Sequence, residues 1–224
     1  MSKTVIVDSG FNDSYKKLLQ FLLGKDLNII KIKNYDNQKL DLILFTGGAD
    51  VHPEYYRENI GKYTQVNKKR DTEAFDFLDN YYMQTKNVPK LGICRGSQLL
   101  CVMNGGSLIQ HVEGHAISGM HKITLDLNQN GNYAKINISS THHQMMYPFN
   151  VQHKLIGWSS RYLSNVYLDG DNKEKELHNS FLEPEIVYFP DNNGLAIQGH
   201  PEFEGTPELT LDYIKVMVKQ YLNI

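Results

Sequence analysis

The segment LGICRG, residues 91–96, places a cysteine between two glycines at the end of an apolar run. A nucleophile on a tight strand-to-helix turn needs small residues two positions before it and two positions after it. Gly92, Cys94 and Gly96 have this spacing. At a helix N-terminus the thiolate is favoured by the helix dipole and by free backbone N–H groups. A buried cysteine with only a packing role is the alternative, since free cysteine is among the most buried residue types.

His200 and Glu202 follow a later apolar run and are separated only by Pro201. In an extended segment, this spacing points both side chains to the same side. The carboxylate can then hold one imidazole nitrogen while the other nitrogen faces a nucleophile, as in a catalytic triad. Taken alone, a histidine beside a proline after a strand is more typical of a turn.

A third candidate is FTGGADVHP, residues 45–53, in which an apolar run ends in Gly47 and Gly48. Backbone N–H groups at the carboxyl end of a strand lie where open α/β sheets bind ligands. Such a group could supply half of an oxyanion hole, with the N–H of Arg95 supplying the other half. A simple strand-end turn is the alternative. No Gly-Lys-Ser/Thr follows, which argues against a nucleotide-binding P-loop.

Alternating strand-like and helix-like segments predict the elements that position these residues. In the first half we expect strands at 4–8, 27–32, 41–48 and 90–94, and helices at 15–23, 71–86 and 97–103. The second half predicts strands at 121–127, 134–138, 153–160, 185–190 and 194–199, then a helix at 207–222. Residues 161–184 are polar and poorly periodic and predict a long surface excursion. This order indicates one α/β domain, residues 1–224, with a mostly parallel sheet covered by helices on both faces.

Composition narrows the function classes. The chain has 224 residues and a formal net charge of −2, which gives no bulk attraction to nucleic acid or to a membrane. The sequence contains no run of about 18 apolar residues, so no membrane span is predicted. The N-terminus resembles a strand rather than a signal peptide. Cys94 and Cys101 are about 10 Å apart on the predicted helix, too far for a disulfide. Two reduced thiols predict a cytoplasmic protein.

Together, the three segments resemble the class I glutamine amidotransferase superfamily, and within it the γ-glutamyl hydrolase branch, which includes the γ-glutamyl-γ-aminobutyrate hydrolase type. Arg95 directly after the cysteine is typical of that branch. The matching stretches are TGGADVHPEYY, RDTEAFDFLDNYYMQTKNVPKLGICRGSQLLCVMNGGSLIQHVEGH, SSTHHQMMYP and IQGHPEF.

This resemblance implies a flavodoxin-like sheet and a triad in which Cys94 is the nucleophile, His200 the acid and base, and Glu202 the residue that orients His200. The implied oxyanion donors are the N–H groups of Gly48 and Arg95. The positions implied to contact the substrate are Gln98, His142, His143 and Gln144. The implied reaction is hydrolysis of a γ-glutamyl amide through a thioester on Cys94, without a cofactor.

The sequence departs from the family pattern at three places. Gly199 stands where the family has an aromatic residue, which predicts a wider floor of the site. Residues 161–184 replace a shorter stretch and predict a difference in substrate choice or partner docking. Cys101 stands where the family more often has asparagine, and we expect it to be packed rather than reactive.

Nine histidines raise the question of a metal, above all His111 and His115 with Glu113 between them. The spacing suits two ligands only in a helix, and Gly114 disfavours a helix. No H-E-x-x-H order and no zinc-like cysteine pair is present. The sequence therefore predicts no metal.

Three functions remain open. The first is a free-standing hydrolase of a small γ-glutamyl substrate, with a homodimer left open. The second is a glutaminase subunit that delivers ammonia to a separate synthetase, because the sequence contains no second catalytic domain and no nucleotide-binding motif. The third is a non-catalytic binding protein on the same fold. Turnover without a partner would favour the free-standing hydrolase over the glutaminase subunit. A covalent adduct on Cys94 would favour either of these enzymes over the non-catalytic binding protein.

Overall fold

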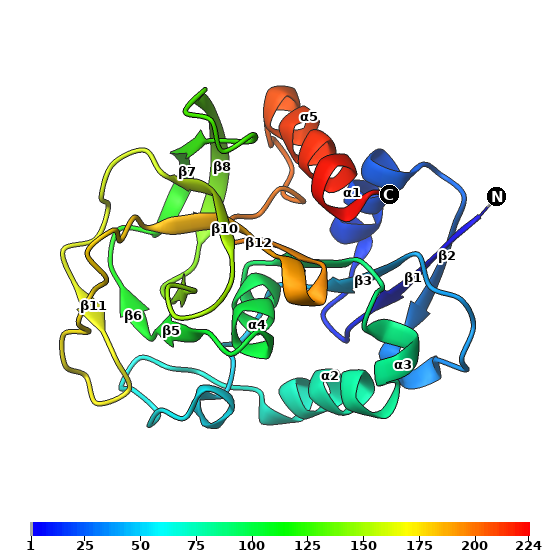
Figure 1. Cartoon of the computed structure of the whole chain (residues 1–224), viewed down its shortest axis with the longest axis horizontal. Helices are drawn as coiled ribbons and strands as arrows, with labels where there is room; N and C mark the ends of the chain where they lie inside the picture. Colours follow the sequence, from blue (N-terminus) through cyan, green and yellow to red (C-terminus); the bar gives the residue numbers. More distant parts are fainter. Residues whose placement is uncertain (1) are drawn as a thin grey trace.

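The computed structural model describes residues 2–224, and a nine-stranded sheet forms its centre (Figure 1). Its strands are β1 (Lys3–Val7), β2 (Leu27–Lys31), β3 (Leu42–Phe45), β4 (Lys90–Ile93), β7 (Ala116–Leu125), β8 (Ala134–Thr141), β10 (Lys154–Ser159), β12 (Pro184–Phe189) and β13 (Gly194–Ile197). Their spatial order is β2-β1-β3-β4-β13-β12-β10-β7-β8. The first five strands of this order run parallel, and the others pair antiparallel. The predicted α/β fold with a mostly parallel sheet is confirmed.

Helices cover both faces of the parallel strands (Figure 1). One face carries α1 (Asp13–Leu23) and α5 (Glu208–Met217), and the other carries α2 (Lys68–Asn80), α3 (Tyr82–Thr85) and α4 (Arg95–Met103). Successive side chains of a strand point to opposite faces. In β1, Val5 and Val7 therefore join the apolar cluster of α1 and α5, and Ile6 joins that of α2 and α4. Burial on both faces explains why these strands are continuous apolar runs.

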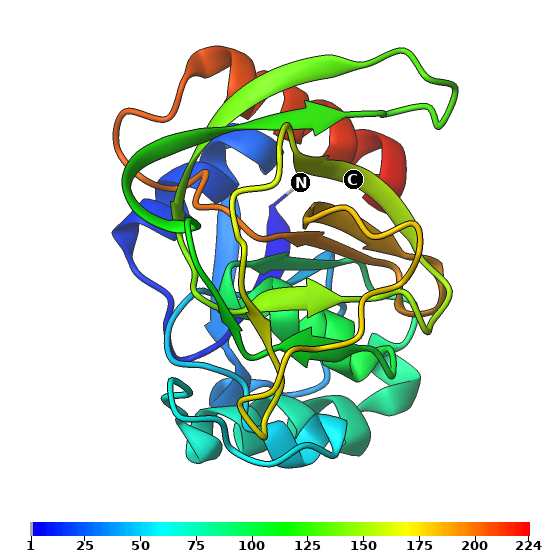
Figure 2. The same cartoon turned by 90° about the vertical axis from the view of Figure 1, so that its left-hand side faces the viewer.

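The antiparallel strands β7 and β8 form a long hairpin that arches beside α5 (Figure 2). Ile136 and Ile138 of β8 belong to the same apolar cluster as Ile214 of α5. The Thr210 hydroxyl also donates to the Asn137 carbonyl oxygen over 2.7 Å. These contacts fix the end of β8 relative to the parallel strands.

Residues 161–184 are not only a surface excursion, and that prediction is wrong in part. They contain β11 (Tyr167–Leu168), which pairs with β6 (His111–Val112). A further small sheet pairs β5 (Ser107–Ile109) with β9 (Met145–Tyr147). Phe181 is buried with Ile109 and Met145, and Glu183 is 2% exposed. The segment is therefore exposed in part, over most of residues 171–180, and anchored in part, where the buried Glu183 carboxylate accepts hydrogen bonds from Leu163 N and Ser164 N.

The predicted helices are present with small differences in their bounds. The segment 71–86 begins earlier, at Lys68, because the Asn67 side chain caps the helix by accepting from Arg70 N. It is also divided at Tyr81 into α2 and α3. The last helix continues from α5 into a π-helical turn, Val218–Leu222. No helix within residues 2–224 is both long and apolar enough to cross a membrane.

The strand order determines which loops meet. β4 lies between β3 and β13, and all three run parallel. The carboxyl ends of parallel strands lie at one edge of the sheet, where α/β proteins bind ligands. Gly47 and Gly48 follow β3, Cys94 follows β4 and His200 follows β13. Three segments far apart in the sequence are thereby brought to one edge.

Candidate active site

Cys94 occupies a strained turn between β4 and α4. Its backbone has φ 51° and ψ −111°, a conformation that a non-glycine residue rarely adopts. The turn is held by its own carbonyl oxygen, which accepts from Ser97 N at 2.9 Å, Gln98 N at 3.2 Å and Ser97 Oγ at 2.6 Å. The positions of Gly92 and Gly96 leave no space for a side chain. A Cβ at Gly92 would overlap the Gly96 carbonyl oxygen, and a Cβ at Gly96 would overlap that of Phe45.

This geometry predicts the effect of Gly96→Ala. We expect the free energy of unfolding to fall by about 1–3 kcal/mol, the usual cost of overpacking, although alanine has the higher helix propensity. The measurement is chemical denaturation. Gly194→Ala is the matched control, since the new Cβ there lies 3.5 Å from Leu100 Cδ1, an ordinary contact. Equal stability of the two variants would contradict the tight elbow.

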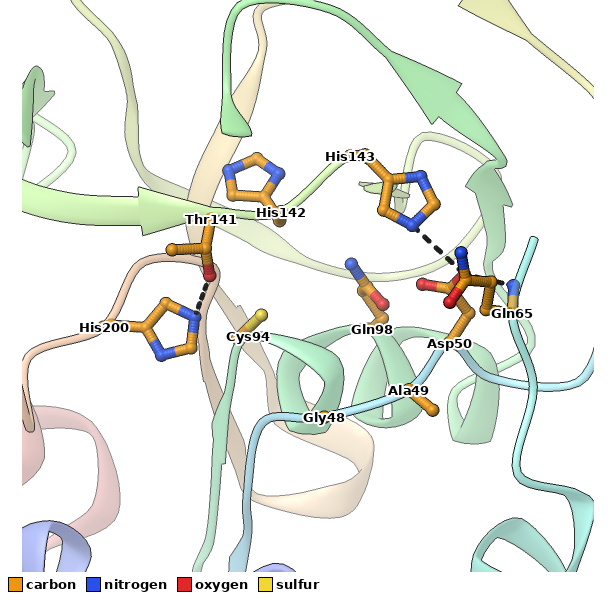
Figure 3. A pocket seen from close by; sticks show the side chains of 10 residues that line it. All are labelled: Gly48, Ala49, Asp50, Gln65, Cys94, Gln98, Thr141, His142, His143 and His200. Carbon is orange, nitrogen blue, oxygen red and sulfur yellow. Dashed lines mark hydrogen bonds and ion pairs between the residues drawn. The ribbon is translucent and has the colours of Figure 1, made fainter. Parts of the chain in front are cut away.

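His200 lies next to Cys94 and is held on both sides of its ring. Its Nδ1 is 2.7 Å from Glu202 Oε1, and its Nε2 is 2.7 Å from Thr141 Oγ1. The Phe203 ring stacks on the imidazole with centroids 4.3 Å apart. Figure 3 shows the Cys94 sulfur and the imidazole edge facing the same pocket. The three side chains predicted to form a triad are all buried and adjacent.

The environment of His200 favours its charged form. Burial alone would lower its pKa, but the neighbouring Cys94 and Glu202 outweigh burial and raise the pKa to about 10. The imidazole is therefore protonated at neutral pH. An imidazolium beside a thiol stabilises the thiolate, which is the reactive form of cysteine.

The two predicted oxyanion donors have no hydrogen-bond acceptor within the described part of the chain, since neither Gly48 N nor Arg95 N donates there. The loop that carries Gly48 is fixed by neighbours. Arg70 Nη1 donates to the Gly47 carbonyl oxygen at 2.7 Å, and Gly47 N donates to the Tyr15 hydroxyl at 2.9 Å. Gly48 has φ 140°, and a Cβ there would overlap Arg70 Nη1. Only glycine fits this position.

The side chain of Arg95 has a separate role beneath the site. It is 1% exposed and forms ion pairs with Asp71 and, at 3.5 Å, with Asp8. Asp8 Oδ2 also lies 2.7 Å from Arg70 Nη2. Asp71 accepts from His52 N at 2.8 Å. This buried network ties the elbow to the loop after β3, and the sequence did not reveal it.

A pocket of about 250 Å³ opens above Cys94 (Figure 3). Its lining residues are Gly48, Ala49, Asp50, Gln65, Cys94, Gln98, Thr141, His142, His143 and His200. Gln98 Nε2 donates to the Gln144 carbonyl oxygen at 3.1 Å, whereas Gln98 Oε1 is buried and has no partner among residues 2–224. A buried acceptor without a donor is the place where a ligand N–H group is expected.

The predicted substrate-side residues divide into two groups. Gln98, His142 and His143 line the pocket, but Gln144 does not. The Gln144 side chain instead donates to Thr64 Oγ1 at 3.1 Å. The main-chain carbonyl oxygen of Gln144 accepts from Gln98 Nε2 and lies 2.9 Å from His142 Nδ1. Gln144 thus lies behind the pocket as a support.

His143 forms an ion pair at the rim of the pocket. Its Nε2 lies 3.2 Å from Asp50 Oδ2, and this contact raises the pKa of His143 despite partial burial. The same Asp50 oxygen accepts from Gln65 N at 2.8 Å. The pocket therefore presents the Asp50 carboxylate and the His143 imidazole on the side of Cys94 away from His200 (Figure 3).

The structure bears on two of the positions at which the sequence differs from the family pattern, Gly199 and Cys101. The expectation that Gly199 widens the floor is wrong, because a Cβ there would lie 2.8 Å from Ile138 Cγ2. Ile138 of β8 occupies the space beside Gly199. Cys101 is fully buried, and burial raises the pKa of its thiol to about 12. It is packed and unreactive at neutral pH, as expected.

Sequence reasoning missed several residues of the pocket. Thr141 contacts His200, and Tyr15 contacts Gly47 from α1. Asp50 and Gln65 form the rim. Thr141 could have been noticed from its place in the SSTHHQ motif. Tyr15 and Gln65 carry no local signal, because only the tertiary fold brings them to the site.

Comparisons with known structures agree with this fold. The solved structures that resemble the chain include one described as a GMP synthase subunit from Thermoplasma acidophilum, with a TM-score of 0.61, 20% identity and coverage of 97% of this chain and 92% of that one. PurLQS from Thermotoga maritima gives a TM-score of 0.60 at 17% identity and covers 100% and 98%. At this identity the likeness concerns the fold alone.

The matches to sequence relatives cover only part of each chain. A Schizosaccharomyces pombe protein named as a glutamine amidotransferase is 36% identical over 85 residues, which cover 37% of this chain and 33% of that protein. A glutamine amidotransferase-like protein of Rickettsia prowazekii is 40% identical over 75 residues, covering 33% and 26%. The matched segments thus span about a third or less of these two relatives.

The family match, the sequence relatives and the fold together support the glutamine amidotransferase-like class I superfamily, as the sequence predicted at that level. Residues 27–161, more than half of the chain, match the sequence model described as Peptidase C26. The chain belongs to the Peptidase C26 family.

Proposed function

We propose that this chain hydrolyses a γ-glutamyl amide through a covalent γ-glutamyl thioester on Cys94. The observation that carries the proposal is that Cys94, His200 and Gly48 line one pocket, while Gly48 N and Arg95 N donate to no acceptor within residues 2–224. A nucleophile, a base held by a third group, and oxyanion donors are the parts that acyl transfer requires.

The proposed first half-reaction forms the thioester. The Cys94 thiolate attacks the amide carbon, and the carbonyl oxygen becomes an oxyanion that accepts from Gly48 N and Arg95 N. Loss of one such donor commonly costs about 3 kcal/mol of transition-state stabilisation. The His200 imidazolium then protonates the amide nitrogen as its bond to carbon breaks, so that ammonia or an amine leaves.

The second half-reaction returns the enzyme to its starting state. Neutral His200 takes a proton from water, and the hydroxide oxygen attacks the thioester carbon. The same two N–H groups hold the second oxyanion. Glutamate leaves, and the thiolate and the imidazolium are restored. Glu202 keeps the His200 ring in place in both halves through its 2.7 Å contact with Nδ1.

The rim of the pocket suits the charged end of a γ-glutamyl group. The Asp50 carboxylate and the free Gln98 Oε1 are acceptors for an α-ammonium group, and protonated His143 is a donor for an α-carboxylate. The pocket volume of about 250 Å³ falls just below the range of about 300–1,000 Å³ for drug-sized ligands. The proposed substrate is therefore an amino-acid amide rather than a long peptide.

This assignment predicts that Gln98→Leu raises KM by about 10- to 100-fold with little change in kcat, because a hydrogen bond to a charged group is worth about 1.5–3 kcal/mol. Steady-state kinetics with glutamine would measure the effect. Gln84→Leu is the control, since Gln84 is exposed on α3. A fall in kcat with unchanged KM would contradict a role in ground-state binding.

A second role, as a glutaminase subunit for a separate synthetase, is supported by the fold shared with PurLQS and with the protein described as a GMP synthase subunit. The test compares glutamate release from glutamine and from γ-glutamyl-γ-aminobutyrate by the purified chain, with Cys94→Ala as control. Release that the control lacks supports the free-standing hydrolase, and the faster substrate identifies the leaving amine. No release by the isolated chain would overturn that role and favour a subunit or a binding protein.

A further inference from the structure

Three histidines from separate segments surround one buried carboxylate behind the wall of the pocket. His115 precedes β7, His121 lies in β7, and His142 follows β8. Glu185 of β12 is fully buried, and its Oε1 lies 3.1 Å from His115 Nδ1, 3.0 Å from His121 Nε2 and 3.6 Å from His142 Nε2. A second buried carboxylate, Glu183, lies beside them. We name these five residues the histidine–glutamate cluster.

The inward atoms of this cluster lack well-directed hydrogen bonds. Within residues 2–224, no hydrogen-bond partner is found for His115 Nδ1, His121 Nε2, His142 Nε2 or either Glu185 oxygen. All four residues are at least nine-tenths buried. Buried polar groups in native proteins are almost always paired, and unpaired ones point to a missing water or ion. Several unpaired ligand atoms aimed at one point favour an ion.

Two of the outer nitrogens, those of His115 and His142, lie beside groups of the kind that metal-bound histidines usually contact. His115 Nε2 lies 3.2 Å from Glu183 Oε2, and His142 Nδ1 lies 2.9 Å from the Gln144 carbonyl oxygen. Glu183 is itself fixed by Leu163 N at 2.8 Å and Ser164 N at 2.9 Å. A metal-ligating histidine typically donates its second N–H to a carboxylate or a backbone carbonyl. His142 shows this arrangement through a hydrogen bond, and His115 shows it through an ion-pair contact alone, because its Nε2 has no hydrogen-bond partner within residues 2–224.

Charge leads to the same conclusion. Glu183 and Glu185 bring two negative charges into the interior, where an uncompensated charge is strongly unfavourable. Protons alone would balance them only if two imidazoles were charged. The rings of His115 and His142 have centroids 4.7 Å apart, and those of His115 and His121 5.4 Å, so two imidazolium groups would repel one another. One divalent cation with three neutral imidazoles leaves the cluster neutral.

We propose that His115, His142 and Glu185 bind a divalent transition metal, Zn²⁺ by the choice of ligands, with His121 as the fourth ligand. The ligand atoms of the first three lie within 4.8 Å of one another. Tetrahedral Zn²⁺ with bonds of about 2.0–2.1 Å separates its ligands by about 3.3 Å. The three histidine nitrogens lie at 3.0–3.6 Å from Glu185 Oε1, which is close to that separation. Four protein ligands and no access to solvent define a structural site rather than a catalytic one.

The metal would tie β7, the end of β8 and β12 together behind Thr141 and His143. It would thereby fix the wall of the pocket that contacts His200 without entering the reaction. This inference differs from the expectation of no metal drawn from the spacing of His111 and His115. His111 is not part of the cluster and stacks on Tyr63 at 4.0 Å.

The test uses the Cys94→Ala protein, so that the thiolate of Cys94 cannot bind the metal. After treatment with chelator and desalting, ZnCl2 is titrated, bound zinc is counted by elemental analysis, and Tm is followed. We expect about one zinc per chain, a rise in Tm, and loss of both in His115→Asn and Glu185→Gln on the same background. His153→Asn is the control outside the cluster and should bind zinc like its parent.

CoCl2 gives a second readout that does not depend on the stability of the cluster variants. A tetrahedral nitrogen and oxygen site produces visible absorption without thiolate charge-transfer bands. Such a spectrum supports the cluster, and thiolate bands would assign the metal to Cys101 and overturn the proposal. Absence of zinc binding and of any change in Tm would overturn it too, as would binding unchanged in folded His115→Asn and Glu185→Gln proteins.

Discussion

The Cys94→Ala variant is expected to lose at least about 10⁴-fold in kcat for glutamate release while it remains folded. Removal of the nucleophile from a hydrolase of this type costs several orders of magnitude, because the remaining groups contribute only binding and oxyanion stabilisation. Alanine at φ 51° carries a strain similar to that of cysteine. Tm should therefore change little. Steady-state kinetics and thermal unfolding together measure both parts of this prediction.

Cys101→Ala is the matched control for that experiment. Cys101 is on the same helix, but it is fully buried and does not line the pocket. Its loss leaves a small cavity and should lower Tm, whereas turnover should persist. Activity retained by Cys94→Ala and lost in a folded Cys101→Ala protein would show that the wrong cysteine has been assigned.

The His200→Asn variant is expected to lose at least about 10³-fold in kcat, since it removes both the acid–base group and the cation beside the thiolate. The rate of Cys94 alkylation by iodoacetamide near neutral pH should fall as well, because the thiolate loses its partner. Alkylation separates this role from a purely structural one. His153→Asn, remote from the site, should alkylate at the wild-type rate, and equal rates for His200→Asn would contradict the thiolate–imidazolium pair.

The pH profile of the wild-type enzyme follows from the same pair. The pKa of His200 is raised to about 10, so the imidazolium is present at neutral pH and loses its proton as pH rises through about 10. We expect kcat/KM to stay high at mildly alkaline pH and to fall as pH approaches 10. The profile is measured with glutamine across that range. An alkaline limb near 6.5, the ordinary value for histidine, would mean that His200 is not paired in the free enzyme.

The parallel strands and the elbow could be predicted from the sequence because both depend on local pattern. Continuous apolar runs such as residues 41–48 indicate strands buried on both faces. The spacing of Gly92, Cys94 and Gly96 reflects contacts within and just beside a single turn. Once the strands are taken as parallel neighbours, His200 and the Gly47–Gly48 loop must lie beside Cys94.

The remainder depends on contacts that no local pattern records. Arg95 pairs with Asp8 and Asp71, residues from β1's end and α2 that only the fold brings together. The histidine–glutamate cluster brings together residues within or next to β7, β8 and β12, whereas His111, the near neighbour of His115 in the sequence, lies outside it. In an all-β region, ligands come from neighbouring strands rather than from i and i+4 positions of a helix. In the polar segment 161–184, the sequence likewise gives no sign that Glu183 is buried.

The central claim, a covalent intermediate on Cys94, is tested most directly by intact-mass and peptide mass spectrometry. The purified protein is treated with a diazoketone analogue of glutamine, with and without excess glutamine. The account predicts a single adduct on the peptide that carries Cys94, slowed by glutamine and absent in Cys94→Ala. Binding of the analogue without any adduct, or an adduct on Cys101 alone, would contradict it.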